Sequence, residues 1–280
     1  AHNMADNTSS PYSLLTIFST VAWGLGYFGM PHILLRFMAI GEEKKLVLSR
    51  RIATVWVVIS MFVAILIGII GYGASVAGVL PMFETSSESE TIIIRLAGLL
   101  AEKNFLLALV AGVVLAGILA CTMSTADSQL LTAASSVSQN LLQDFLKIKM
   151  SPKQSMLAAR LTVVGISLIA VVLAWNPDSS VFYIVSFAWA GFGAAFGPVV
   201  LFSLFWRRTN FQGALAGMLT GGVMVFVWKY LVKPMGGVWG IYELLPAFIL
   251  GCIAIVVVSL ATVAPSEEIL KEFDSVKEEK

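Results

Sequence analysis

A run of sixteen apolar residues, Phe105 to Ala120, carries no charged or polar side chain. At about 1.5 Å of helical rise per residue, this run and its continuation reach across the roughly 30 Å of a bilayer's hydrocarbon core. Six more apolar segments of comparable length are spread along the chain. The sequence therefore predicts an all-α polytopic membrane protein with about seven transmembrane helices. The predicted spans cover residues 13–38, 52–74, 105–130, 156–175, 181–206, 211–232 and 241–263.

The composition favours this class and disfavours others. Apolar residues make up 58% of the chain and charged residues 12%, against roughly 25% charged in soluble domains. The net charge of +1 comes without a basic patch, so no nucleic-acid partner is expected. An enzyme is not expected either, because the sequence contains no nucleophile–base pair, metal-ligand cluster or phosphate-binding loop.

Lysine and arginine predict the orientation in the membrane. With the N-terminus outside, fourteen of the 18 Lys and Arg residues lie in the inner loops and tail, and four lie outside. This bias follows the positive-inside rule, so we expect a cytoplasmic C-terminus and a charged cytoplasmic tail at residues 265–280. The N-terminal segment is polar and lacks an initiating Met, which indicates the cut edge of a longer chain.

The first span has an unusual centre. The residues Trp23–His32 include three glycines and Pro31, all of which weaken or remove helical hydrogen bonds. We expect a broken helix here, and irregular backbone at membrane depth is tolerated only where it is buried in protein or lines a cavity. Trp23, Tyr27 and Pro31 recur every four residues, on one helical face. Two interpretations are open, a packed face with a proline kink or a lining for a substrate.

Polar groups gather at the inner end of the third span. Ser124 and Thr125 follow Cys121 by three and four residues, so on a helix the Cys121 carbonyl lies on the same side as both hydroxyls. Three neutral oxygens of this kind suit Na⁺. The alternative is that the hydroxyls donate to carbonyls one turn earlier, which is common in membrane helices.

Asp127 adds a carboxylate to the same stretch. A charge at this depth costs on the order of 3 kcal/mol on insertion scales, which makes the residue a functional candidate. It can shape the route by which an ion leaves, or it can pair with a cation such as Arg160.

Three stretches together resemble the sodium:solute symporter family, namely Trp23 to Arg36, Met123 to Leu131 and Ser186 to Ser203. The resemblance extends over about Ser13 to Ala264. It implies a LeuT-type fold of two inverted five-helix repeats, of which this chain has the second and two trailing helices. It also implies Na⁺-coupled uptake by alternating access in a bacterial cytoplasmic membrane, with the missing N-terminal helices of the same chain as a partner.

The resemblance implies a substrate site in the first span. Trp23, Tyr27 and Pro31 match family positions implicated in substrate binding and the outer gate. The implied solute is L-proline. Two alternatives are kept open, a sodium symporter for another small carboxylate or nutrient and a non-transporting membrane sensor of the same fold.

The resemblance also implies a sodium site in the third span. The Cys121 carbonyl and the hydroxyls of Ser124 and Thr125 match half of that site, with Cys121 in place of a usual alanine. The other half, and an acidic residue important for Na⁺, lie on an early helix that this sequence lacks. The implied coupling ion is therefore Na⁺, and no organic cofactor is implied.

Overall fold

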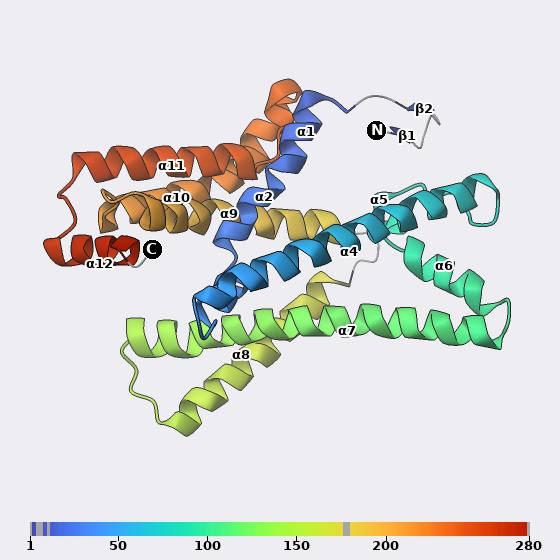
Figure 1. Ribbon diagram of the computed structural model, residues 1–280, viewed down its shortest axis with the longest axis horizontal. Coiled ribbons are helices and arrows are strands. Elements are labelled where there is room, and N and C mark those ends of the chain that lie inside the picture. Colours follow the sequence, from blue (N-terminus) through green and yellow to red (C-terminus); the bar gives the residue numbers. More distant parts are fainter. Residues whose placement is uncertain (1, 4–7, 10–11, 176–179, 279–280) are drawn as a thin grey trace. The chain divides into compact units, whose positions relative to one another are not determined.

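The computed structural model describes residues 2–3, 8–9, 12–175 and 180–278, most of which are helical (Figure 1). Two short strands, β1 (His2–Asn3) and β2 (Thr8–Ser9), pair antiparallel. Six of the described helices are long and apolar enough to cross a membrane, and two stretches that meet at a bend form a seventh span. The prediction of an all-α membrane protein with about seven spans is therefore confirmed.

The chain divides into two compact units. The terminal unit combines Ala1–Met38 with Phe182–Lys280, and the middle unit is Ala39–Val181. The first span therefore belongs to the same unit as the C-terminal helices, although the middle unit separates them in sequence. Residues of the C-terminal segment therefore pack in the same unit as the first span.

The first span of the terminal unit is broken, as predicted. Its first part runs through α1 (Leu14–Val21), α2 (Trp23–Gly26) and the 3-10 turn η1 (Tyr27–Gly29), and its second part is α3 (Pro31–Met38). The two parts meet at an angle of 53°. The break falls at Met30, whose backbone is extended with ψ at 110°. A residue that precedes proline disfavours the helical conformation, and proline itself is well placed as the first residue of the next helix.

The rest of the terminal unit consists of long apolar helices and a short polar one. They are α9 (Val181–Phe205), which begins at the boundary with the middle unit, α10 (Phe211–Val227), the π-helical turn η3 (Trp228–Val232), the 3-10 turns η4 (Lys233–Met235) and η5 (Gly237–Gly240), α11 (Leu244–Ala261) and α12 (Glu267–Glu278). Helices α10 and α11 form the most extensive contact between elements of the molecule.

Small residues bring α9, α10 and α11 together around a buried core. The core side chains are Ala190, Ala194, Val225, Leu244, Ala247 and Phe248. A Cβ placed on Gly221 would lie 2.0 Å from the carbonyl oxygen of Ala194, so only glycine allows α10 to approach α9 this closely. Small residues commonly allow such close helix packing in membrane proteins.

The middle unit contains three long helices, with two short helices between the first and the second. Its elements are α4 (Lys44–Val76), α5 (Ser86–Ser89), α6 (Ile92–Ala101), α7 (Phe105–Ser135), the π-helix η2 (Ser136–Phe145) and α8 (Pro152–Leu173). Helix α7 begins at an Asn104 cap and continues without a break into η2. Helix α8 begins with a capping box between Ser151 and Gln154.

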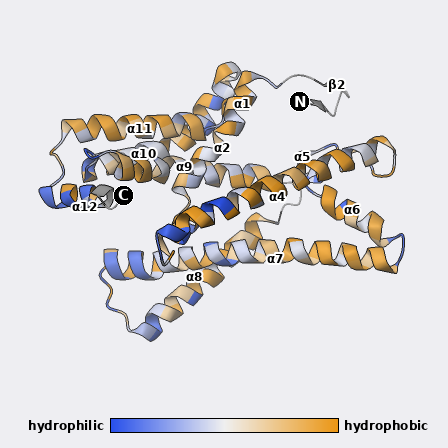
Figure 2. Cartoon of the chain, in the orientation of Figure 1, coloured by the Kyte–Doolittle hydropathy of each residue, from blue (hydrophilic) through white to orange (hydrophobic). Residues whose placement is uncertain are grey.

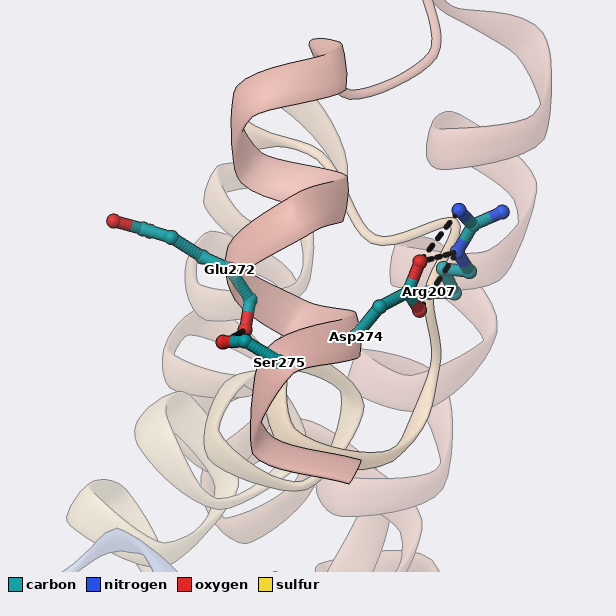
Figure 3. A network of polar contacts seen from close by, with 4 residues as sticks. All are labelled: Arg207, Glu272, Asp274 and Ser275. Carbon is teal, nitrogen blue, oxygen red and sulfur yellow. Dashed lines mark hydrogen bonds and ion pairs between the residues drawn. The ribbon is translucent and has the colours of Figure 1, made fainter. Parts of the chain in front are cut away.

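Hydropathy separates the long helices from their ends. Figure 2 shows the middles of α7 and α11 as hydrophobic, whereas α12 and the first turns of α4 are hydrophilic. The charged tail expected at residues 265–280 contains α12 as a helix through most of its length. Within the terminal unit, Arg207 binds Asp274 of α12 through both carboxylate oxygens, with the shortest contact at 2.8 Å (Figure 3).

Candidate substrate and ion sites

An aromatic cluster surrounds Trp23 in the terminal unit. The Trp23 ring stacks on three other rings, those of Phe182, Trp189 and Tyr242, with centroids 5.3, 5.6 and 5.9 Å away. Tyr27 packs edge-on against Trp189 at 4.8 Å and 84°. Parallel-displaced and edge-to-face arrangements are those that aromatic rings prefer. The structure thus brings the two predicted aromatic residues together on a third one.

Glycines allow α2 to lie directly against α9. A Cβ on Gly26 would lie 1.9 Å from the indole nitrogen of Trp189, and a Cβ on Gly193 would lie 2.7 Å from the Cα of Gly26. At this close approach, Trp189 donates its Nε1–H to the Trp23 carbonyl at 2.9 Å. The helical stretch nevertheless continues to η1 and breaks only at Met30. Gly26 therefore serves helix packing rather than the break that the sequence led us to expect of the glycines.

Pro31 lies on the other side of the break, as the first residue of α3. The chain turns by 53° between the two helical stretches, so the helical spacing that relates Trp23 to Tyr27 does not continue to Pro31. Tyr27 is 52% exposed, and Pro31 is partly buried. The prediction that all three residues share one helical face therefore does not follow from their spacing, because that spacing assumes an unbroken helix.

Sequence reasoning missed the rings that hold Trp23. Trp189 lies in the stretch from Ser186 to Ser203, which was noted only for the family resemblance, and Phe182 and Tyr242 lay outside every motif. A lone tryptophan among glycines and alanines was a usable signal, because a large ring beside a close helix contact must occupy the groove those small residues leave. Nothing in the local sequence of Tyr242 relates it to the first span.

The predicted ion-binding oxygens lie on α7 in the middle unit. Thr125 Oγ1 donates to the Cys121 carbonyl at 3.2 Å, and Ser128 Oγ donates to the Ser124 carbonyl at 3.0 Å. Donation to a carbonyl one turn earlier, the simpler of the two interpretations, is therefore present at Thr125. The same bond is made along α7 and into η2 by Thr122, Thr132 and Ser136.

The Cys121 carbonyl already accepts two hydrogen bonds, one from Thr125 Oγ1 and one from the helical N–H four residues later in α7, so a cation would have to replace the hydroxyl as its partner. A donating hydroxyl keeps its own lone pairs, so the Thr125 hydroxyl can still accept. The Ser124 hydroxyl makes no hydrogen bond to any described residue, and all three residues are exposed on α7. Hard cations such as Ca²⁺ take roughly six to eight oxygen ligands, so three oxygens from one helix can form only part of a site.

Asp127 is exposed on α7 and takes part in none of the ion pairs between described residues. The pair with Arg160 that the sequence allowed is therefore not formed. Across the described part of the chain, no group of three or more His, Cys, Asp or Glu side chains is arranged to hold a metal ion. The Cys121–Thr125 turn of α7 offers neutral hydroxyl and carbonyl oxygens.

Comparison with known protein families gives a match that covers both the broken first span and α7. The model of the sodium:solute symporter family matches residues 3–221, which include the broken span, all of α7 and all of α9. The chain belongs to the sodium:solute symporter family. The name of this family describes transporters that move a solute together with sodium. Helix α11 and the loop before it lie beyond the matched residues.

Individual relatives agree along nearly the whole chain. The sodium/proline symporter of Haemophilus influenzae is 41% identical over 263 residues, which are 94% of this chain and 51% of the relative. The sodium/proline symporter of Escherichia coli is 41% identical over 93% of this chain and 50% of its own length. The high-affinity proline transporter PutP of Bacillus subtilis is 39% identical over 95% of this chain and 54% of its own length.

The chain spans about half the length of the curated relatives it matches. No solved structure matches it. The family and its membrane-spanning character are therefore established for the chain itself, whereas the activity of a whole symporter involves residues of the relatives to which nothing here corresponds.

Proposed function

We propose that this chain forms part of a sodium-coupled proline symporter that works by alternating access. The observation that carries the proposal is the identity of about 41% with sodium/proline symporters over 94% of the chain. In this proposal the chain contributes one side of a proline site at the broken first span. It contributes one part of a sodium site on α7.

In this proposal the proline site is lined by Trp23, Tyr27 and Pro31. Proline combines an apolar ring with an ammonium group and a carboxylate. The flat faces of Trp23 and Tyr27 suit the apolar ring and attract a cation through their π electrons. The start of α3 at Pro31 carries the positive end of a helix dipole, which favours the carboxylate.

In this proposal one part of the sodium site consists of the Cys121 carbonyl and the hydroxyls of Ser124 and Thr125. Their oxygens are neutral, which suits a monovalent hard cation that carries too little charge to require carboxylates. Ligands from helices outside this chain would complete the shell. We place Asp127 on the route by which the ion leaves, because its exposed carboxylate forms no ion pair with any described residue.

The remaining parts of the proposal concern the parent protein. We propose that it has the LeuT-type inverted-repeat fold, and that this chain supplies the second repeat and two trailing helices. The N-terminal side of the chain would face outward and its C-terminus the cytoplasm of a bacterial inner membrane, as the lysine and arginine distribution favours. Isolated, the exposed oxygens of α7 would meet lipid, which is costly for polar groups.

The experiment is uptake of radiolabelled proline into proteoliposomes that contain the parent transporter, with and without an inward sodium gradient. Excess unlabelled amino acids, small carboxylates and other nutrients serve as competitors. Uptake that requires Na⁺ and is blocked chiefly by unlabelled proline supports the proposal. Uptake driven by sodium but blocked better by another solute would keep the coupling and change the substrate. No sodium-driven uptake of any solute would favour a sensor and contradict the proposal.

A further inference from the structure

The aromatic cluster at Trp23 is held by a residue from outside the family-matched part of the chain. Tyr242 precedes α11 and lies beyond residue 221, where the family match ends. Its ring stacks on Trp23 at 5.9 Å, with the two planes 17° apart. Helix α11 also packs directly against α2, which carries Trp23 (Figure 1). A segment far along the chain thus reaches the residue that the proposed function assigns to proline.

Tyr242 is fixed in three directions. Its backbone N–H donates to the hydroxyl of Ser19 in α1 at 3.0 Å, and its own hydroxyl donates to the Ser186 carbonyl of α9 at 2.6 Å. Burial, with a further contribution from the neighbouring Glu243 carboxylate, raises the pKa of the Tyr242 hydroxyl. The hydroxyl therefore stays protonated and remains a donor at physiological pH. The ring is held between α1 and α9 while one of its faces meets Trp23.

The loop that carries Tyr242 is itself anchored by a buried charge. The side chain of Glu243 is only 3% exposed, and it pairs with Lys233 at 2.8 Å. Glu243 also stands at the start of α11, where the positive end of the helix dipole favours a carboxylate. Moving the loop would leave the nearly buried Glu243 carboxylate without its Lys233 partner, which is energetically costly. The position of Tyr242 is accordingly well defined.

We propose that Tyr242 is a positioning residue for proline, which holds the Trp23 ring in place and thereby sets the affinity for the solute. This inference rests on the proposed function, since it assumes that Trp23 contacts proline. Tyr242 does not have to touch the solute itself. We expect its effect to fall on the affinity for the solute and not on the coupling to sodium, because Tyr242 contacts Trp23 within the terminal unit, whereas the proposed sodium ligands lie on α7 in the middle unit.

The test compares Tyr242→Phe and Tyr242→Leu in the full-length transporter, with Tyr183→Phe as the matched control. The Tyr183 hydroxyl makes no hydrogen bond to any described residue, and Tyr183 is 63% exposed on α9. Loss of the Tyr242 hydroxyl should raise the KM for proline about fivefold, which is the factor that corresponds to the net free energy of one typical hydrogen bond. Loss of the ring as well should raise it roughly twentyfold, since the stacking on Trp23 goes too.

Three readouts separate positioning from general damage. The maximal rate per folded transporter and the sodium concentration for half-maximal uptake should stay within twofold of the wild type in Tyr242→Phe and in the control. A fall in maximal rate with an unchanged KM would overturn the proposal. So would equal KM shifts in Tyr242→Phe and Tyr183→Phe.

Hydrogen–deuterium exchange distinguishes failure of this inference from failure of the proposed function. If Tyr242 braces Trp23, amides of residues 22–30 should exchange faster in Tyr242→Leu, while amides of α4 keep their wild-type rates. This readout needs no transport. A wild type without proline uptake would reject the proposed function, whatever the exchange shows. Unchanged exchange at residues 22–30 would reject the proposal that Tyr242 holds Trp23 in place, even if the wild type transports proline.

Discussion

The two units of the chain bury their apolar helices to very different degrees. In the terminal unit, a third of the most apolar stretch of α9 and of α11 is buried, whereas in the middle unit none of that stretch is buried in α4 or α8. Among the described residues, every apolar side chain with zero exposure lies in the terminal unit, for example Leu244 and Val225. The terminal unit therefore packs against itself, while the middle unit leaves its apolar faces for lipid or for other helices.

The difference has a structural cause in the small residues. In the terminal unit, Gly213, Gly217 and Gly221 of α10 face backbone or buried side chains of α9 and α11 at distances that only glycine permits. In the middle unit, Gly68, Gly112 and Gly165 have open space where a Cβ would stand. Glycine thus closes helix contacts along α10, whereas these three glycines of the middle unit leave the helix surface unoccupied. Substitutions of glycine should therefore separate the two units most clearly.

The largest effect is expected from Gly221→Ala in α10. A Cβ at this position would lie 2.0 Å from the Ala194 carbonyl oxygen, and a backbone atom cannot rotate away. We expect a loss of about 3 kcal/mol of folding free energy, at the upper end of overpacking effects. The adjacent Gly222→Ala is the control, since its nearest contact would be the Ala195 Cβ at 3.8 Å. Thermal unfolding of the purified transporter in detergent should show a lower midpoint for the first variant only.

A smaller effect is expected from Gly71→Ala in α4. The added Cβ would lie 2.1 Å from Cδ1 of Ile92, a side-chain atom that can move aside. The cost should be about 1 kcal/mol, and part of it is recovered by the better helix propensity of alanine. Gly73→Ala, with open space around the new Cβ, should be neutral or slightly stabilising. If Gly71→Ala were as harmful as Gly221→Ala, the contrast in packing between the two units would be wrong.

The smallest effect is expected from Asp274→Asn in α12. Its partner Arg207 is 57% exposed and Asp274 itself 41%, so solvent screens the pair. Exposed ion pairs contribute about 0–1 kcal/mol, and the effect should vanish at high salt. Glu272→Gln is the control, because the Glu272 side chain points away from Arg207 (Figure 3). A large loss of stability that persists in high salt would show that α12 contributes more to the terminal unit than its exposed contacts indicate.

Long apolar runs were enough to predict the class and the number of spans, because a bilayer leaves a chain few choices. The break could be placed near Pro31, since proline and its preceding residue restrict the backbone locally. The rings around Trp23 could not be predicted, because Phe182 and Tyr242 reach it through tertiary packing that leaves no local pattern. The same holds for Asp127, whose suggested pair with Arg160 depended on how α7 and α8 pack.

The sodium requirement of Thr125→Ala tests the central claim most directly. Its matched control is Thr122→Ala, because Thr122 makes the same kind of bond, to the Ile118 carbonyl at 3.0 Å, and is also exposed on α7. In the full-length transporter, Thr125→Ala should raise the sodium concentration for half-maximal proline uptake about tenfold. This is the effect expected when a contact between a hydroxyl oxygen and a charged ion, similar in strength to a hydrogen bond, is lost.

The affinity for proline at saturating sodium should stay within twofold of the wild type in both variants, and Thr122→Ala should keep the wild-type sodium requirement. An equal loss of uptake at every sodium concentration, or the same shift in both variants, would mean that the hydroxyl of Thr125 serves α7 alone. The proposed sodium site would then have to be abandoned.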